Sequence, residues 1–215
     1  MSQSGTAAAD LTAAGTPLPQ LWLLRHGETE WSRDGNYTGL TDLPLTPIGE
    51  QQARDAAARL TGVEFDLVLT SPLQRARRTA ELAGYPDAET LPYAHEWDYG
   101  DNEGRNSALV RQENPGYLIW QHGVPNGETI DQVAARADRV IARVQAGCGT
   151  PADPDPDATP VRHALLVAHG HFLRVLTARW LEFNAMEGRR FILGTAAVCA
   201  LGWDKRTPAI LRWNL

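Results

Sequence analysis

Three short apolar runs, QLWLL, FDLVLTS and RHALLVAHG, are each followed at once by polar residues and then by a helical pattern. Runs of this length that are apolar rather than alternating are typical of strands buried on both faces. Such strands alternating with helices indicate a mainly parallel sheet that is covered by helices on both sides. The sequence therefore predicts an α/β fold, a three-layer α/β/α sandwich.

The helix signals between these runs support the same fold. Thr46 followed by Pro47 is a hydroxyl cap with proline in the first turn, and the helix that starts there should stop at Gly62. PLQRARRTAELAG predicts a helix ending on Gly84. Two further helices are expected in ETIDQVAARADRVIARVQAG, which has one apolar stripe, and in HFLRVLTARWLEF. TAAVCALGW and PAILRWNL predict a closing hairpin at the edge of the sheet.

The length of 215 residues suits one domain, which we place at residues 20–215. Residues 1–19 are small and polar and predict a disordered N-terminal tail; without a basic start or an apolar core they do not resemble a secretory signal. Residues 92–126 have weak periodicity, several aromatics and glycines, and predict a lid insertion with short helices. Residues of about 147–160 predict a flexible surface linker.

Composition excludes several classes of partner. The net charge of −6 argues against nucleic acid, and no apolar run approaches the length of about 20 residues that spans a membrane. Because Lys205 is the only lysine, an anion site here must use arginine. Cys148 and Cys199 form no disulfide framework, which favours a reducing cytoplasm. The sequence leaves the oligomeric state open, a homo-oligomer included.

Charged and polar side chains stand where the three predicted strands end. The first strand delivers Arg25 and His26, the second ends at Ser71 with Arg75 one helical turn later, and the third ends at His169. In parallel sheets, ligands bind beyond the carboxyl ends of the strands. We therefore expect two guanidinium groups and two imidazoles to meet at one edge of the sheet.

This combination predicts a phosphate site. Arginine binds phosphate oxygens through charge-assisted bonds, and the helix amino ends after Ser71 and Gly170 are expected to add backbone donors. Gly27 is expected to let the chain turn sharply and leave His26 exposed at the strand tip. Because nearby cations disfavour its protonation, His26 should stay neutral, with one ring nitrogen free to attack phosphorus.

A histidine nucleophile needs a proton donor, because an alkoxide is a poor leaving group. Glu96, in HEWDYGDNEG of the predicted lid, is the best candidate. Position alone leaves three local rivals, Asp98, Asp101 and Glu103.

Metal sites are weaker interpretations of the same residues. His169 and His171 form a His-x-His pair that could bind zinc, but no third ligand is evident. The aspartates of the predicted linker could form a calcium loop, but prolines break its geometry. We expect no metal and no cofactor.

Four motifs, LLRHGETEW, TSPLQRARRTAEL, EWDYGDNEG and VAHGH, together resemble the histidine phosphatase superfamily, the phosphoglycerate mutase-like proteins. The resemblance runs from about residue 20 to the end of the chain. It implies that His26 becomes a phosphohistidine and that Arg25, Arg75 and His169 form the phosphate pocket. It also implies that Glu96 is the proton donor, that Glu96 later activates the hydrolytic water, and that no metal is needed.

A narrower likeness lies in YTGLTDLPLT, EWDYGDNEG, NGET and AHGHFLRVLTARW. These segments resemble the branch that holds fungal sedoheptulose-1,7-bisphosphatase and bacterial acid phosphatases. The likeness implies substrate contacts at five positions: Ser32, Thr38, Gly39, Tyr99 and Gly170.

Departures from the mutases favour hydrolysis of the phosphoenzyme over transfer of its phosphoryl group back to a substrate. The lid lacks their paired arginines, and their long C-terminal tail has no counterpart. The expected function is hydrolysis of small sugar phosphates, with a small phosphorylated metabolite as the partner. A cofactor-dependent phosphoglycerate mutase and a non-catalytic phospho-ligand-binding module are the alternatives. A second phosphate of the substrate is expected to meet Arg105 or Arg111 of the lid.

Overall fold

The computed structural model describes residues 16–148, 154–155 and 161–215. In chain order the elements are β1 (Thr16–Pro17), β2 (Gln20–Arg25), α1 (Glu30–Asp34), α2 (Pro47–Leu60), β3 (Leu67–Thr70), α3 (Gln74–Leu82), β4 (Glu89–Thr90), the 3₁₀ helix η1 (Gly100–Asn102), α4 (Ser107–Glu113), α5 (Ile119–His122), α6 (Ile130–Cys148), β5 (Pro154–Asp155), β6 (His163–Ala168), α7 (Gly170–Trp180), the 3₁₀ helix η2 (Ala185–Arg190), β7 (Val198–Asp204) and β8 (Thr207–Arg212).

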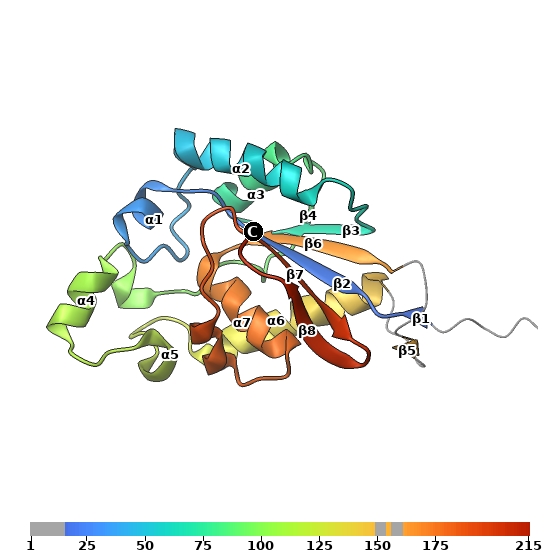
Figure 1. Ribbon diagram of the computed structural model, residues 1–215. Coiled ribbons are helices and arrows are strands. Elements are labelled where there is room, and N and C mark those ends of the chain that lie inside the picture. The colour runs from blue at the N-terminus through green and yellow to red at the C-terminus, as the bar shows by residue number, and fades with distance from the viewer. Residues whose placement is uncertain (1–15, 149–153, 156–160) are drawn as a thin grey trace, which may run out of the picture.

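A six-stranded sheet in the order β4-β3-β6-β2-β7-β8 forms the centre of the fold (Figure 1). The first four strands of that order run parallel to one another, whereas β7 pairs antiparallel with both β2 and β8. The predicted mainly parallel sheet is confirmed, and β7 and β8 form the predicted closing hairpin at its edge.

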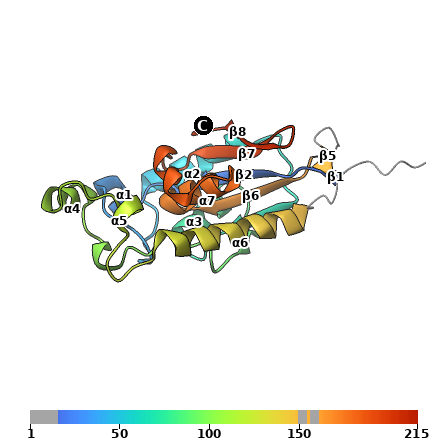
Figure 2. The ribbon, with the colours of Figure 1, turned by 90° about the horizontal axis from the view of Figure 1, so that it is seen from below.

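Helices cover both faces of this sheet, as Figures 1 and 2 show: α2 and α3 lie on one side, α6 and α7 on the other. Neighbouring residues of β2 serve opposite layers, because side chains alternate along a strand. Leu21 and Leu23 belong to the apolar cluster that includes α6 and α7, whereas Trp22 and Leu24 pack with α2 and α3. Full burial of a leucine side chain stabilises the fold by about 1.5–3 kcal/mol. The three-layer prediction is confirmed.

The capping signals place the helix ends correctly. The Thr46 side chain accepts from the amide of Gly49, Pro47 opens α2, and α2 ends two residues before Gly62. Gly62 and Gly84 both follow a helix with positive φ values, +84° and +100°, which glycine adopts without strain. The helix α6 continues to Cys148, so the first two residues of the segment predicted as a linker, about 147–160, are helical. Apolar contacts of Val144 and Cys148 extend the buried stripe beyond the point where the sequence becomes glycine-rich.

The predicted tail and linker meet at a short parallel pairing of β1 with β5. In addition, the indole Nε1 of Trp203 donates to the carbonyl of Pro19, so the main sheet holds the chain one residue before the predicted start of the domain. The predictions for residues 1–15, 149–153 and 156–160, the calcium alternative among them, lie outside the described residues.

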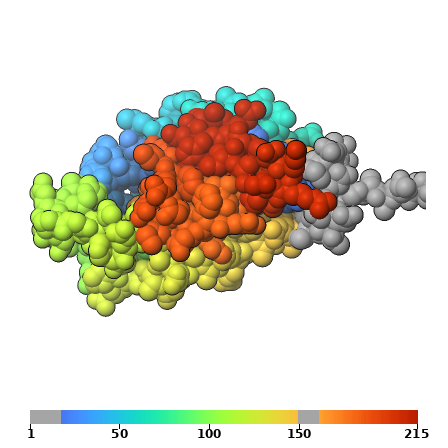
Figure 3. All heavy atoms as spheres, turned by 60° about the horizontal axis from the view of Figure 1, so that its bottom comes forward, coloured from blue at the N-terminus to red at the C-terminus, as the bar shows by residue number. Residues whose placement is uncertain are grey.

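The predicted lid, residues 92–126, contains the expected short helices η1, α4 and α5. It is attached to the loop after β2 by a bridge between Asn36 and Asn106 and by backbone hydrogen bonds of Tyr37. Figures 1 and 2 show α4 and α5 at the end of the molecule opposite β1, and Figure 3 shows this green segment against the blue residues that follow β2. None of the helices in the described part of the chain combines the length and hydropathy that a membrane-spanning segment needs.

Candidate active site

The parallel register brings the three strand ends together. Arg25 of β2 stands opposite Ala168 of β6, and Val167 of β6 stands opposite Thr70 of β3. The residues that follow therefore converge at the carboxyl edge of the sheet, as predicted. The ring centroids of His26 and His169 are 5.2 Å apart.

A cavity of about 200 Å³ opens at this edge. Its wall contains the predicted residues Arg25, His26, Ser32, Thr38, Glu96, Tyr99 and Gly170, together with Gly35, Asn36, Tyr37, Ser107, His171, Arg174 and Leu193. Three of the predicted site residues, Gly39, Arg75 and His169, do not line it. The lid segment contributes Glu96, Tyr99 and Ser107, which places it at the wall of the cavity.

His26 is held as a neutral imidazole with one free nitrogen. Its Nδ1 lies 2.7 Å from the carbonyl oxygen of Gly27. Because a carbonyl only accepts, Nδ1 carries the proton and the lone pair is on Nε2. Burial lowers the pKa of His26 well below 6.5, with smaller contributions from Arg75 and Arg25. The predicted neutral state agrees with this direction, but burial, which the sequence did not reveal, is the larger cause.

Gly27 is required by close packing, which differs from the expected sharp turn. Its φ lies outside the left-handed region. A Cβ on Gly27 would lie 2.2 Å from the carbonyl oxygen of Gly49 in α2. The backbone just after β2 thus approaches α2 more closely than a side chain at residue 27 would permit, next to His26.

Arg25 presents donors that the protein leaves unpaired. Its Nη1 donates to the carbonyl of Leu193 at 2.7 Å, whereas its buried Nε has no partner among the described residues. A Cβ on Gly170 would lie 3.3 Å from that Nε, so glycine keeps the space beside it free. An anion in the cavity could accept a charge-assisted hydrogen bond from this Nε.

Arg75 and His169 lie behind the cavity wall. Arg75 donates to the carbonyls of the 38–41 loop at 2.8–3.3 Å and through Nε to Nδ1 of His169 at 3.2 Å. Nε2 of His169 therefore carries the proton and donates to Ser71 Oγ at 2.6 Å. Burial, with Arg75 next, lowers the pKa of His169 well below 6.5. Both side chains hydrogen-bond protein groups in this structure, and their predicted role in binding phosphate stays a prediction.

Glu96 is positioned by three backbone amides. Oε1 accepts from Trp97 at 2.9 Å and from Phe172 at 2.8 Å, and Oε2 accepts from His171 at 3.0 Å. The carboxylate is buried and still reaches the cavity wall. Its two partners in α7 come from the first turn, where the helix dipole favours negative charge.

Protein groups already occupy several of the amides at the two helix amino ends, so the predicted role of these ends in phosphate binding stays a prediction. Glu96 occupies the amino end of α7. At α3, the amide of Leu73 donates to Ser71 Oγ and that of Gln74 to Asp42 Oδ1. A neighbouring hydroxyl and two carboxylates from distant segments thus accept from four amides of these ends, whereas Gly170 and Arg25 line the cavity.

The three rivals of Glu96 have other partners. Asp98 accepts from the amide of Gly100, and Asp101 accepts from the side chain of Asn126. The carboxylate of Glu103 accepts from the amides of Gly39 and Thr41 and so holds the 38–41 loop. Glu96 is the one of the four that lines the cavity.

Comparison with known proteins agrees with this geometry. The model of the histidine phosphatase superfamily (branch 1) matches residues 21–215. The chain belongs to the histidine phosphatase superfamily. It is 38% identical over 187 residues to an acid phosphatase of Mycobacterium tuberculosis, covering 86% of this chain and 87% of that protein. It is 37% identical over 194 residues to sedoheptulose 1,7-bisphosphatase of Saccharomyces cerevisiae, covering 79% and 70%.

A solved structure from Mycobacterium tuberculosis superimposes with a TM-score of 0.80 at 37% identity, covering 92% of this chain and 97% of that one. The expected family and fold are therefore confirmed.

Several cavity residues of this histidine phosphatase were not predicted as part of the phosphate site: His171 was considered only as a zinc ligand, and Arg174 was not singled out. Nδ1 of His171 lies 2.5 Å from the hydroxyl of Tyr99, and burial, Arg174 and Arg25 lower the pKa of His171 to about 3. Arg174 uses Nε and Nη2 on the carbonyls of Gly188 and Arg189 and lines the cavity. The spacing contained a signal, because Arg174 lies four residues after Gly170 on one helix, and residues three or four apart on a helix share a face.

The expected second phosphate contact at Arg105 or Arg111 is not supported, since neither side chain lines the cavity. Arg105 pairs instead with Glu113. The zinc alternative finds no support either: both ring nitrogens of His169 have protein partners. Across the described ranges, no three His, Cys, Asp or Glu side chains are grouped as a metal site.

Proposed function

We propose that this histidine phosphatase hydrolyses small sugar phosphates through a phosphohistidine on His26. The observation that carries the proposal is the pairing of a neutral His26, whose Nε2 is free, with an unpartnered donor of Arg25 on the same cavity wall. Glu96 adds the proton donor, as a carboxyl group that backbone amides hold at the same wall.

In the first step, Nε2 of His26 attacks phosphorus and the phosphorus–oxygen ester bond breaks. The carboxylic acid of Glu96 gives its proton to the departing oxygen, and Arg25 stabilises charge on the phosphoryl oxygens. In the second step, the carboxylate of Glu96 takes a proton from water, which attacks the phosphohistidine. Inorganic phosphate leaves, and the neutral imidazole and protonated Glu96 return.

The wall of the cavity supports a small polar substrate. Tyr99, Ser107 and Asn36 offer groups that hydrogen-bond sugar hydroxyls, in a volume of about 200 Å³. Arg174 adds a cation for a second anionic group of the substrate. The 37% identity to sedoheptulose 1,7-bisphosphatase favours this substrate class.

We further propose that catalysis needs no metal and that the enzyme works in the cytoplasm on a small phosphorylated metabolite. The proposed steps use only the side chains of His26, Arg25 and Glu96, together with the substrate and water. Cys148 and Cys199 are buried free thiols, which supports a reducing compartment.

The test is hydrolysis of p-nitrophenyl phosphate by the wild type and by His26→Ala. We expect a loss of at least about 1000-fold in the variant, because the nucleophile is removed. An unchanged rate refutes the mechanism. A screen of phosphorylated metabolites, including six- and seven-carbon bisphosphates, then ranks substrates by phosphate release. Interconversion of 3- and 2-phosphoglycerate with 2,3-bisphosphoglycerate present would instead indicate a mutase.

A further inference from the structure

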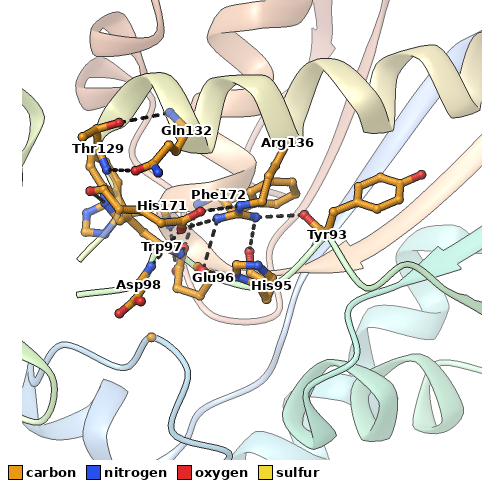
Figure 4. A network of polar contacts seen from close by, with 12 residues as sticks. Tyr93, His95, Glu96, Trp97, Asp98, Thr129, Gln132, Arg136, His171 and Phe172 are labelled. Atoms are coloured by element: carbon orange, nitrogen blue, oxygen red, sulfur yellow. Dashed lines mark hydrogen bonds and ion pairs between the residues drawn. The ribbon is translucent and has the colours of Figure 1, made fainter. Parts of the chain in front are cut away.

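Arg136 of α6 and Glu128, just before that helix, form an ion pair. Figure 4 shows the side chain of Arg136 reaching from α6 toward the segment that carries His95 and Glu96. The pair is bidentate: Nε and Nη2 of Arg136 each lie 2.7 Å from one carboxylate oxygen. The side chains are only 11% and 16% exposed, and neither lines the cavity. The pair is therefore mostly buried without taking a direct part in the cavity.

Every N–H of the Arg136 guanidinium has an acceptor. Besides the two bonds to Glu128, Nη1 donates to the carbonyls of Tyr93 and His95 at 2.9 Å, and Nη2 donates to the carbonyl of Glu96 at 3.3 Å. Residues 93–98 form neither helix nor strand. Their carbonyls therefore lack the backbone hydrogen-bond partners of a helix or a sheet, and the guanidinium of Arg136 donates to three of them instead.

Glu128 holds the other side of Glu96. Its Oε2 accepts from the amide of Asp98 at 3.0 Å, and its own amide donates to the carbonyl of Asp98 at 3.0 Å. The indole of Trp97 donates to the carbonyl of Glu128 at 2.8 Å. The backbone on both sides of Glu96 is thus fixed by this one ion pair.

Arg136 also reaches the partners of the Glu96 carboxylate. Its guanidinium carbon lies 4.9 Å above the ring centroid of Phe172, whose amide donates to Oε1 of Glu96. The carboxylate and the helix that receives it are therefore positioned by the same side chain.

We propose that Arg136 and Glu128 are positioning residues that set the carboxyl group of Glu96 for proton transfer. The inference rests on the proposed function, because it concerns the acid of that reaction. A displacement of about 1 Å at a reacting group costs about 100-fold in rate. A change in the pair should therefore act on the protonation step and spare phosphate binding.

Two aryl phosphates of nearly equal shape separate that step from general damage. Phenolate is a poor leaving group that needs a proton, whereas p-nitrophenolate leaves without one. For Arg136→Lys, which cannot supply five planar donors, we expect kcat/KM for phenyl phosphate to fall about 100-fold and that for p-nitrophenyl phosphate to fall less than about 5-fold. Glu128→Gln keeps the side-chain volume and should give the same pattern. If Arg136→Lys does not fold, Glu128→Gln tests the positioning role of the pair in its place.

A double variant tests whether the pair acts through Glu96. Once Glu96→Gln has removed the acid, adding Arg136→Lys should cause less than about 3-fold further loss on phenyl phosphate, because coupled residues are not additive. Arg179→Lys is the matched control. Arg179 makes a bidentate pair with Asp138 across α6 and α7 and does not contact the Glu96 segment, so both substrates should be unaffected.

The outcomes separate the two proposals. A wild-type chain that hydrolyses neither aryl phosphate overturns the proposed function and this inference with it. An active wild type whose folded variants lose both substrates equally, lose neither, or show additive losses with Glu96→Gln overturns the inference alone. Circular dichroism establishes which variants are folded.

Discussion

Acidification should destabilise this protein through its buried histidines, and His26 gives the clearest case. Burial, Arg75 and Arg25 hold the pKa of His26 well below 6.5 in the folded state. In the unfolded chain the same imidazole has its ordinary pKa of about 6.5. Below that pH the unfolded state binds a proton that the folded state does not. The free energy of unfolding therefore falls as the pH falls.

The size of the effect depends on the unfolded pKa alone, as long as the folded pKa stays below the range studied. Between about pH 7 and about pH 5.5, one such histidine removes about 1.3 kcal/mol of stability. His169 and His171 also have lowered pKa values, that of His171 being about 3. Together the three histidines should remove about 4 kcal/mol over this interval.

Urea unfolding of the wild type and of His26→Asn at both pH values isolates the contribution of His26. Asparagine keeps a donor for the carbonyl of Gly27 but does not titrate. Between the two pH values, the free energy of unfolding of the variant should fall by about 1.3 kcal/mol less than that of the wild type, whatever the stability of the variant at neutral pH. Parallel losses would mean that His26 has an ordinary pKa in the folded protein. His26 would then be partly charged over this pH range and would not be a neutral nucleophile.

Three further outcomes are expected. In Gly27→Ala, a Cβ would lie 2.2 Å from the backbone oxygen of Gly49, so thermal unfolding should show a loss of about 3 kcal/mol or more; an unchanged Tm would contradict the close approach. Arg174→Met should raise KM about 10-fold or more for a bisphosphate substrate and less than about 2-fold for p-nitrophenyl phosphate, because one charge-assisted contact is lost; equal changes for both would refute that role. Incubation with EDTA should leave p-nitrophenyl phosphate hydrolysis unchanged, and a loss restored by a divalent cation would disprove the metal-independent mechanism.

The parts of the fold that the sequence predicted are those fixed by local rules. Apolar runs predicted the strands, Thr46 with Pro47 predicted the start of α2, and parallel strands necessarily bring Arg25 and His169 to one edge. The alternation within β2, which sends Leu23 and Leu24 to opposite layers, follows from strand geometry.

The remaining features depend on which distant groups meet. The sequence does not show that Glu96 occupies the amino end of α7, or that Asp42 caps α3, because each partner comes from a loop of no regular structure. The burial that dominates the pKa of His26 is likewise a property of the packed fold. Arg174 was missed because only the packing of α7 beside the lid turns an ordinary helical arginine toward the cavity.

The two arginines expected to bind phosphate together differ in what they would gain from it. Arg75 already donates to His169 and to three carbonyls of the 38–41 loop, so an anion could add little to its hydrogen bonding. Arg25 keeps a buried Nε without a protein partner within the described ranges, and Arg25 lines the cavity. A phosphoryl oxygen would therefore gain a charge-assisted hydrogen bond from Arg25 that Arg75 has already spent on protein groups. On this reasoning Arg25 acts on the substrate in the proposed reaction, while Arg75 maintains the loop on which the cavity depends.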